Sequence, residues 1–207
     1  MRAIAIEPEA YDNFAGLLDA MHRLRARVFQ DRLNWDVTVT DGREADSFDS
    51  CNPTYILALS EQNRVVGCAR LLPATGPTLL DVLFPELRRS GLIRPHTGMI
   101  ESSRFCVDTK PETEGAGRRL HDATWTLFAA LIEWSMSQGY REIVTATDVR
   151  IERILRRAGW PMTRIGEPRP IGNTLAVAGL LSVDQLSFDR VRPANYSSSI
   201  RALARAA

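Results

Sequence analysis

Residues 117–138 carry apolar side chains around more than half of a helical circumference, and Gly139 follows as a helix-ending residue. A helix with so wide an apolar face has to be covered on most of its sides. We therefore expect a central helix packed against other elements. Its apolar positions are Leu120, Trp125, Leu127, Phe128, Leu131, Ile132, Trp134 and Met136.

Short apolar runs and helical patterns alternate along the rest of the chain. The expected strands are residues 3–6, 54–60, 65–72, 99–107, 143–147 and 175–183. The other expected helices are residues 13–29, 79–89 and 149–158. A turn at residues 61–64 predicts that the second and third strands form an antiparallel hairpin. This order predicts an α/β protein, an α/β/α sandwich with a mixed central sheet.

The length of 207 residues predicts one domain over residues 1–207. We expect the Ser-, Ala- and Arg-rich tail from about residue 193 to 207 to be peripheral. Residues 34–53 are polar and acidic without clear periodicity, so they predict a long ordered loop of the kind that often carries function.

Charge and cysteine content exclude several classes of protein. With 26 Lys and Arg against 25 Asp and Glu, the net charge of +1 gives no overall attraction to nucleic acid or to an anionic membrane. An apolar span or a secretory leader is not apparent either. The three cysteines show no CxxC pairing, which favours reduced thiols in the cytoplasm and no zinc site.

Common catalytic and ligand-binding motifs are also missing. The sequence has no Walker A, GxSxG or HExxH pattern, and its acidic loop at residues 44–49 has the wrong spacing for calcium. Gly115 and Gly117 form a lone GxG before the long helix, which could present amides to a pyrophosphate. A simple helix-start loop is the better interpretation of that pattern.

The expected central strand, residues 99–107, has a polar centre where a middle strand should be apolar. In strict alternation, one face carries Glu101, Ser103 and Phe105, and the other carries Ser102, Arg104 and Cys106. Glu101 and Arg104 would then each need a partner from elsewhere. A buried ion-pair network and a general base at Glu101 are equally good explanations.

Other charged and aromatic residues point to the same region. Arg70 lies inside an apolar strand, so it needs an acid, and Asp46 and Asp49 are the obvious suppliers. Arg25 and Phe29 are spaced to share a helix face, and Trp35 follows them. These residues combine a carboxylate-binding guanidinium with two aromatic rings, although such aromatic residues more often belong to a core.

This set of residues resembles the acyl-homoserine lactone synthases, the autoinducer synthases of bacterial quorum sensing. The segments that carry the resemblance are residues 24–29, 32–37, 44–49, 70–73 and 101–105. Residues 21–26, 99–109 and 132–160 are especially similar to the rhizobial and agrobacterial branch that regulates conjugative plasmid transfer. The resemblance implies an N-acetyltransferase-like fold without the usual pyrophosphate loop.

The family reaction joins S-adenosylmethionine to an acyl group carried on acyl carrier protein, and releases methylthioadenosine. The resemblance implies that S-adenosylmethionine is a substrate and that no cofactor is needed. It assigns Glu101 as the base and Ser103 as a donor to the oxyanion. By the same comparison Arg25, Phe29 and Trp35 enclose S-adenosylmethionine. These N-terminal residues would cover the site, and we call them the N-terminal cover. A charge network of Asp46, Asp49, Arg70 and Arg104 would order this cover.

The acyl chain and its carrier need surfaces of their own. Phe128 and Leu131 could line an apolar tunnel, and by resemblance Thr145 is the residue that selects 3-oxo chains, of about eight carbons in this branch. A plain β-branched strand residue is the alternative for Thr145. Arg150, Arg153 and Arg157 share a helix face that could dock the acidic carrier, or could be an ordinary solvated face.

Two other functions remain open at this point. An N-acetyltransferase that uses acetyl-coenzyme A would share the architecture and the GxG loop. A non-catalytic sensor of a small ligand would need no general base, and it should tolerate the loss of the Glu101 carboxylate.

Overall fold

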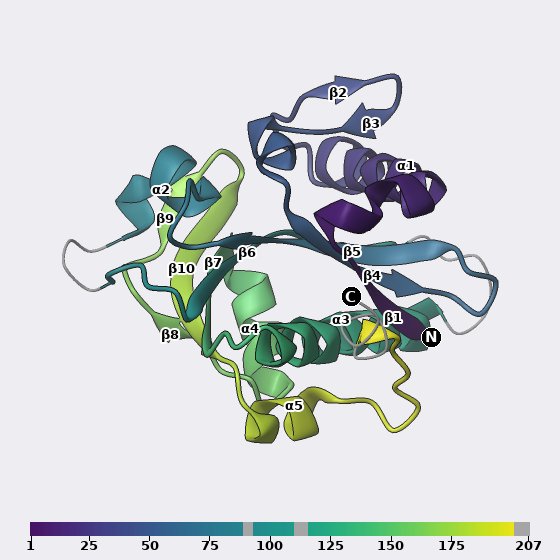
Figure 1. The fold of residues 1–207 in the computed structure, drawn as a ribbon. Coiled ribbons are helices and arrows are strands. Elements are labelled where there is room, and N and C mark those ends of the chain that lie inside the picture. The colour runs from purple at the N-terminus through teal and green to yellow at the C-terminus, as the bar shows by residue number, and fades with distance from the viewer. Residues whose placement is uncertain (89–92, 110–115, 201–207) are drawn as a thin grey trace.

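The computed structural model describes residues 1–88, 93–109 and 116–200, and Figure 1 shows a twisted sheet between two layers of helices. The eight-stranded sheet has the order β1-β4-β5-β6-β7-β10-β8, with β9 paired to β10. Strands β6 and β7 are parallel, and the other pairs are antiparallel. The strands are β1 Arg2–Ile6, β4 Thr54–Leu59, β5 Val65–Pro73, β6 Met99–Val107, β7 Glu142–Asp148, β8 Thr163–Arg164, β9 Arg169–Ile171 and β10 Thr174–Ser182.

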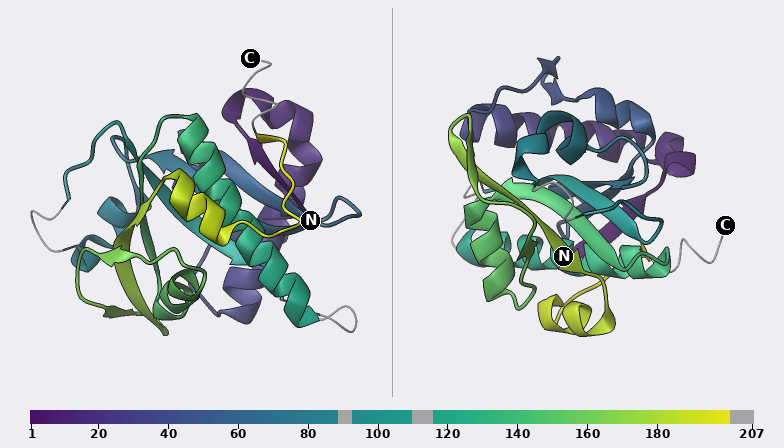
Figure 2. Two further views of the ribbon diagram at one scale, coloured as in Figure 1. Left: turned by 90° about the horizontal axis from the view of Figure 1, so that it is seen from below. Right: turned by 90° about the vertical axis from the view of Figure 1, so that its left-hand side faces the viewer.

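Helices cover both faces of this sheet, which confirms the mixed α/β/α sandwich (Figures 1 and 2). One face carries α1 (Ala15–Ala26), α2 (Leu79–Leu83) and the small hairpin of β2 (Val39–Thr40) and β3 (Arg43–Glu44). The other face carries α3 (Ala116–Ser137), α4 (Val149–Arg157) and α5 (Gln185–Val191). Shorter helical segments are Pro8–Phe14, Arg27–Arg32, Ser47–Cys51 and Pro85–Leu87.

Helix α3 is the central helix that its wide apolar face predicts. Leu127, Phe128 and Leu131 are each at most 3% exposed, and they belong to one apolar cluster with sheet residues such as Ile100 and Ile143. Burial of side chains on several sides of α3 explains why the helix needs apolar residues around so much of its circumference.

One expectation about where a helix ends was wrong. The predicted helix at residues 79–89 splits into α2 and a single turn at Pro85–Leu87. Pro85 disfavours a helical residue before it, and Phe84 is indeed outside the helical region with φ −132° and ψ 44°. Residue 89, the expected end of this helix, lies outside the described residues.

The C-terminal tail is not peripheral as far as residue 200. The Ala3 amide donates to the Ser197 carbonyl at 2.8 Å, and the Ser199 amide donates to the Ala3 carbonyl at 3.2 Å. Ile200 is 2% exposed within the main apolar cluster. Strand β1 is at the edge of the sheet, so its backbone groups are available to hold the tail. Residues 201–207 lie outside the described part.

Candidate active site

Strand β6 departs from regular alternation at its polar centre. Arg104 has φ +53°, and the register between β5 and β6 shifts at this point. Such a bulge lets consecutive side chains turn to one face of a sheet. Ser103 accepts a hydrogen bond from Arg70 Nε at 3.1 Å, while Arg104 contacts Glu44 on the same α1-covered face. The expectation that Ser103 and Arg104 face opposite ways was therefore wrong, because the bulge resets the alternation.

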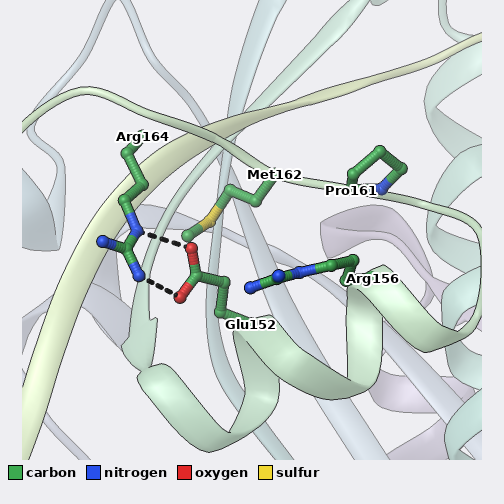
Figure 3. Close-up of a pocket in the computed structure, with 5 residues that line it drawn as sticks. All are labelled: Glu152, Arg156, Pro161, Met162 and Arg164. Atoms are coloured by element: carbon green, nitrogen blue, oxygen red, sulfur yellow. Dashed lines mark hydrogen bonds and ion pairs between the residues drawn. The ribbon is translucent and has the colours of Figure 1, made fainter.

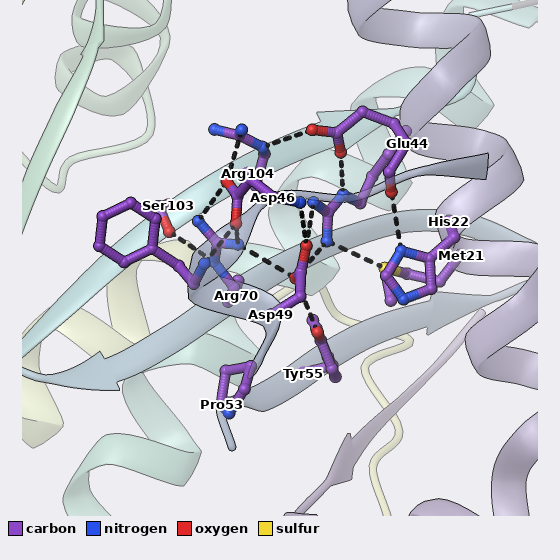
Figure 4. Close-up of polar contacts among 12 residues, drawn as sticks. Met21, His22, Glu44, Asp46, Asp49, Pro53, Tyr55, Arg70, Ser103 and Arg104 are labelled. Atoms are coloured by element: carbon purple, nitrogen blue, oxygen red, sulfur yellow. Dashed lines mark hydrogen bonds and ion pairs between the residues drawn. The ribbon is translucent and has the colours of Figure 1, made fainter. Parts of the chain in front are cut away.

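Six charged side chains on this face form a closed ring in which every arginine lies between two carboxylates (Figure 4). We call it the charge ring. Arg104 contacts Glu44 at 3.1 Å and Asp46 at 2.5 Å. The order around the ring is Arg25, Glu44, Arg104, Asp46, Arg70 and Asp49, and Asp49 closes it on Arg25 at 2.8 Å.

The charge ring is largely buried, and its three arginines balance its three carboxylates. The side chains of Arg25, Glu44 and Arg70 are 0% exposed. Burial by itself raises the pKa of Asp49, but the hydrogen bond from Arg25 and the nearby charges hold that pKa well below its usual value. Tyr55 adds a hydroxyl donor to Asp49 at 2.7 Å. Each charge thus has the partners that burial requires.

The charge ring confirms that Asp46 and Asp49 are the partners of Arg70. Glu44 was not among the candidate site residues, although it begins the acidic segment 44–49 and takes a central place in the ring. Arg25 was expected to enclose a substrate. Its guanidinium instead contacts Glu44, Asp49 and the Met21 sulfur, which favours an ordering role in the ring.

Two aromatic rings beside the charge ring connect the N-terminal cover to strand β10. Phe29 and Trp35 stack with centroids 5.1 Å apart and planes at 5°. The Arg104 guanidinium lies 5.7 Å from the centre of the Phe29 ring. Trp35 Nε1 donates to Thr174 Oγ1 on β10 at 3.1 Å. Phe29 is 1% exposed and Trp35 is half-buried, so Trp35 is the ring of this pair that solvent reaches.

Glu101 lies near the start of β6 and is 1% exposed. The backbone amides of Leu79 and Leu80, at the beginning of α2, donate to its two carboxylate oxygens at 2.9 and 2.7 Å. Burial raises the pKa of Glu101, and the two amides and the nearby arginines oppose this rise. The sequence did not point to these amides, because they depend on where α2 meets the sheet.

The ladder between β6 and β7 ends at Ser102 and Thr145. Beyond this point β6 continues with β5, and β7 continues with β10. The backbone groups of Ser103 and Arg104 that face away from β5 are therefore not used by the β6–β7 ladder. Thr145 Oγ1 donates its hydroxyl proton to the Ser102 carbonyl at 2.8 Å, at the last residue pair of this ladder.

The expected acyl-chain residues lie on the face of the sheet that α3 covers. Phe128 is 1% exposed, and its ring centre lies 5.3 Å from that of Phe105 and 5.7 Å from that of Trp160. Leu131 is part of the same apolar cluster. Thr145 is 9% exposed and lies on β7 directly opposite Gly179 of β10.

The expected carrier-docking arginines are exposed, as a docking role requires. Helix α4 buries Glu152 and Leu155 and presents Arg150, Arg153 and Arg157 to solvent. Glu152 accepts two hydrogen bonds from Arg164 at 2.6 and 2.7 Å. The exposed face of α4 therefore keeps an excess of positive charge.

Metal-binding clusters and membrane-spanning helices are both missing from the part of the chain that the structure describes. Within residues 1–88, 93–109 and 116–200, no group of three or more His, Cys, Asp or Glu side chains is placed to hold a metal ion. None of the helices described there is both long and apolar enough to cross a membrane.

The sequence matches the family model described as autoinducer synthase over residues 10–191. It is 58% identical over 200 residues to the acyl-homoserine-lactone synthase of Rhizobium radiobacter, which covers 97% of this chain and 94% of that protein. The crystal structure of the AHL synthase LasI superposes with a TM-score of 0.78 at 33% identity, and covers 90% of this chain and 93% of that one.

Two further structures bear on the fold alone. The CoA-dependent acyl-homoserine lactone synthase BjaI, solved with SAM and isopentyl-CoA, has a TM-score of 0.81 at 24% identity and covers 99% of both chains. A protein from Lactobacillus plantarum described as an N-acetyltransferase has a TM-score of 0.55 at 16% identity, and covers 89% of this chain and 100% of that one. They confirm the N-acetyltransferase-like architecture.

The match to a rhizobial synthase also confirms the resemblance to the rhizobial and agrobacterial branch. Likeness to N-acetyltransferases is confined to the fold. The family match spans the charge ring, the polar centre of β6 and helix α4. The chain therefore belongs to the autoinducer synthase family, and as an acyl-homoserine-lactone synthase it is an acyltransferase.

Proposed function

We propose that this synthase acylates the amine of S-adenosylmethionine from an acyl carrier protein thioester, and then closes the lactone with release of methylthioadenosine. The observation that carries the proposal is Glu101, a buried carboxylate on the central strand held by two backbone amides. BjaI, which shares the fold and was solved with SAM, supports the choice of nucleophile. Both substrates belong to the cytoplasm, where we place the reaction.

The first step needs a base, because a protonated amine cannot attack a thioester. Glu101 would accept the ammonium proton through a water molecule, since its carboxylate is almost completely buried. Burial raises the pKa of Glu101 and so brings its proton affinity closer to that of an amine. The two amides from α2 keep the carboxylate oriented in both protonation states.

Attack on the thioester creates an oxyanion that needs donors. Ser103 accepts from Arg70, so its own hydroxyl proton remains to be donated. Backbone amides of β6 beyond the end of the β6–β7 ladder would supplement it. Arg104 would act beside them by holding the charge ring against Phe29.

Lactone closure depends on how the enzyme positions the substrate and needs no acid or base catalyst. The substrate carboxylate attacks the carbon that bears the sulfonium, and the neutral thioether leaves as methylthioadenosine. Phe29 and Trp35 would enclose the nucleoside and sulfonium, because aromatic faces attract cations. Arg25, Asp46, Asp49 and Arg70 would order this cover through the charge ring.

The acyl donor could be an acyl carrier protein or an acyl-coenzyme A, since BjaI, which shares the fold, is described as CoA-dependent. The basic face of α4 supports an acidic carrier protein as the donor here. We expect Arg153→Glu to raise the KM for acyl carrier protein about 3- to 10-fold, because reversing an interface charge weakens association. The KM for S-adenosylmethionine should stay the same.

A matched control for Arg153 is Arg141→Glu, which reverses an exposed arginine just before β7. Steady-state kinetics with acyl carrier protein would compare the two variants. Equal KM values in both would remove α4 from the docking surface, whereas a selective rise for Arg153→Glu with acyl carrier protein but not with acyl-coenzyme A would support it.

We propose a 3-oxo product of about eight carbons, selected by Thr145. Its hydroxyl proton now bonds to the Ser102 carbonyl, so it would have to turn to the 3-oxo oxygen when substrate binds. We expect Thr145→Val to lower the ratio of 3-oxo to saturated product about 3- to 10-fold, the range for one lost hydrogen bond. Thr147→Val, two residues along β7, is the control.

Mass spectrometry of the products tests the proposed function directly. The protein would be incubated with S-adenosylmethionine and a mixture of saturated and 3-oxo acyl carrier proteins. Lactone and methylthioadenosine in equal amounts would support it. If a parallel incubation with acyl-coenzyme A gives lactone and the carrier proteins give none, the proposed donor is wrong. An unchanged product ratio in Thr145→Val would mean that Thr145 only packs within the sheet.

A further inference from the structure

Met162 occupies the place where β10 lacks a side chain. A Cβ atom added to Gly179 would lie 2.4 Å from Met162 Cγ and 2.8 Å from Met162 Sδ. The thioether therefore lies directly on the backbone of β10, and only glycine leaves room for it. Met162 is half-buried and packs against the main apolar cluster.

Gly179 is the direct neighbour of Thr145 across the β7–β10 ladder. Opposite residues in an antiparallel pair share a face, with their Cβ positions about 5 Å apart. Thr145 and the space that Met162 fills over Gly179 are thus adjacent on the face that α4 covers. An acyl chain that ran past Thr145 on this face would therefore meet Met162 over β10.

Behind Met162 lies a pocket of about 380 Å³ that opens to solvent (Figure 3). Its other lining residues are Glu152, Arg156, Pro161 and Arg164. Figure 3 shows the Met162 side chain beside the paired Glu152 and Arg164. An alkyl chain that passed Met162 would leave apolar surroundings and enter a polar, charged pocket.

We propose that Met162 sets the upper limit on acyl-chain length in this synthase. The assignment rests on the proposed function, because it needs an acyl chain beside Thr145. Met162 is a specificity-determining residue that acts through contact with the end of the chain. It separates the apolar cluster of Phe128 and Leu131 from the polar pocket behind it.

The size of the side chain sets the expected effect. Changing Met162 to Ala removes three heavy atoms, which is the room that about three methylene groups occupy in a close-packed interior. Acyl chains from fatty-acid synthesis differ by two carbons, so the main product should become two carbons longer. Met162→Phe should favour shorter chains, and Met162→Leu, which nearly conserves volume, should leave the product unchanged.

The experiment offers wild type and each variant an equimolar mixture of acyl carrier proteins with chains of several lengths, together with S-adenosylmethionine. Mass spectrometry gives the length distribution of the lactones. Met136→Ala is the control, because Met136 is also a partly buried methionine packed against the same cluster but lies near the end of α3. Thermal unfolding checks that every variant is folded.

We expect the distribution to shift to longer chains in Met162→Ala and not in Met136→Ala, with an unchanged KM for S-adenosylmethionine. An identical distribution in wild type, Met162→Ala and Met162→Phe would overturn the assignment. Failure of the proposed function looks different, since wild type would then make no lactone from any carrier protein.

Discussion

Glu101→Gln is expected to lower kcat/KM for lactone formation by about 10²- to 10⁴-fold, the usual contribution of a general base. Gln keeps the size of the side chain but cannot accept a proton at neutral pH. One of the two amides of α2 would also face an NH₂ group in place of an oxygen. An unsatisfied buried amide costs about 1–3 kcal/mol, which is less than the 5–15 kcal/mol that keeps an ordinary domain folded.

The control for Glu101→Gln is Glu133→Gln. Glu133 is a buried carboxylate on α3 that accepts hydrogen bonds from Tyr196 and Ser198, on the face opposite the proposed site. Its loss should affect stability and leave kcat unchanged. Methylthioadenosine and lactone would be measured together with urea unfolding. Undiminished turnover in folded Glu101→Gln would remove Glu101 from the role of base.

The pH profile provides a second readout for Glu101. Burial raises its pKa, and only the ionised carboxylate can act as a base. The acid limb of kcat/KM should therefore lie at a higher pH than the usual Glu pKa of about 4.3. This limb should be absent from the residual activity of Glu101→Gln. A limb that persists in the variant would belong to another group.

Glu44→Gln is expected to destabilise the fold by about 3–5 kcal/mol, the cost of removing one partner from a buried ion pair. Glu44 is 0% exposed and lies between Arg25 and Arg104. Without its charge, the fully buried Arg25 guanidinium would depend on Asp49 as its ionic partner. The free energy of unfolding in urea would show the loss, and activity should fall as the cover loosens.

Asp19→Asn is the matched control for Glu44→Gln. Asp19 also contacts two arginines, Arg23 and Arg43, but these contacts are exposed to solvent. Water screens exposed ion pairs, so no measurable change in stability is expected. Equal unfolding curves for the Glu44 and Asp19 variants would mean that the charge ring does not stabilise the fold.

The charge ring also determines how stability depends on pH. Asp49 has a lower pKa in the folded protein than in the unfolded chain, mainly because Arg25 donates to it against the effect of burial. Its contribution to stability is therefore complete above the unfolded pKa of about 3.9 and is lost as the pH falls through the folded pKa. Acid should release the N-terminal cover.

Local pattern was enough to predict most elements but not their ends. The apolar spacing of α3 and the alternation around residues 61–64 act over a few residues, so the sequence alone identified the central helix and the β4–β5 hairpin. Pro85 shortened α2, and the backbone of the edge strand β1 binds residues 197–199 of the tail. Helix α5 was not among the expected helices.

The sequence by itself determined the α/β class, and it determined that Arg70 must meet an acid, because hydrophobic periodicity is local and an unpaired charge in an apolar strand is too costly. Only the tertiary structure decided that Glu44 joins Arg25 to Arg104. It also decided that the bulge brings Arg104 to the same face as Ser103, and that Met162 fills the space over Gly179. These contacts depend on strand register and join residues far apart along the chain, where the pattern of neighbouring residues carries no information about pairing.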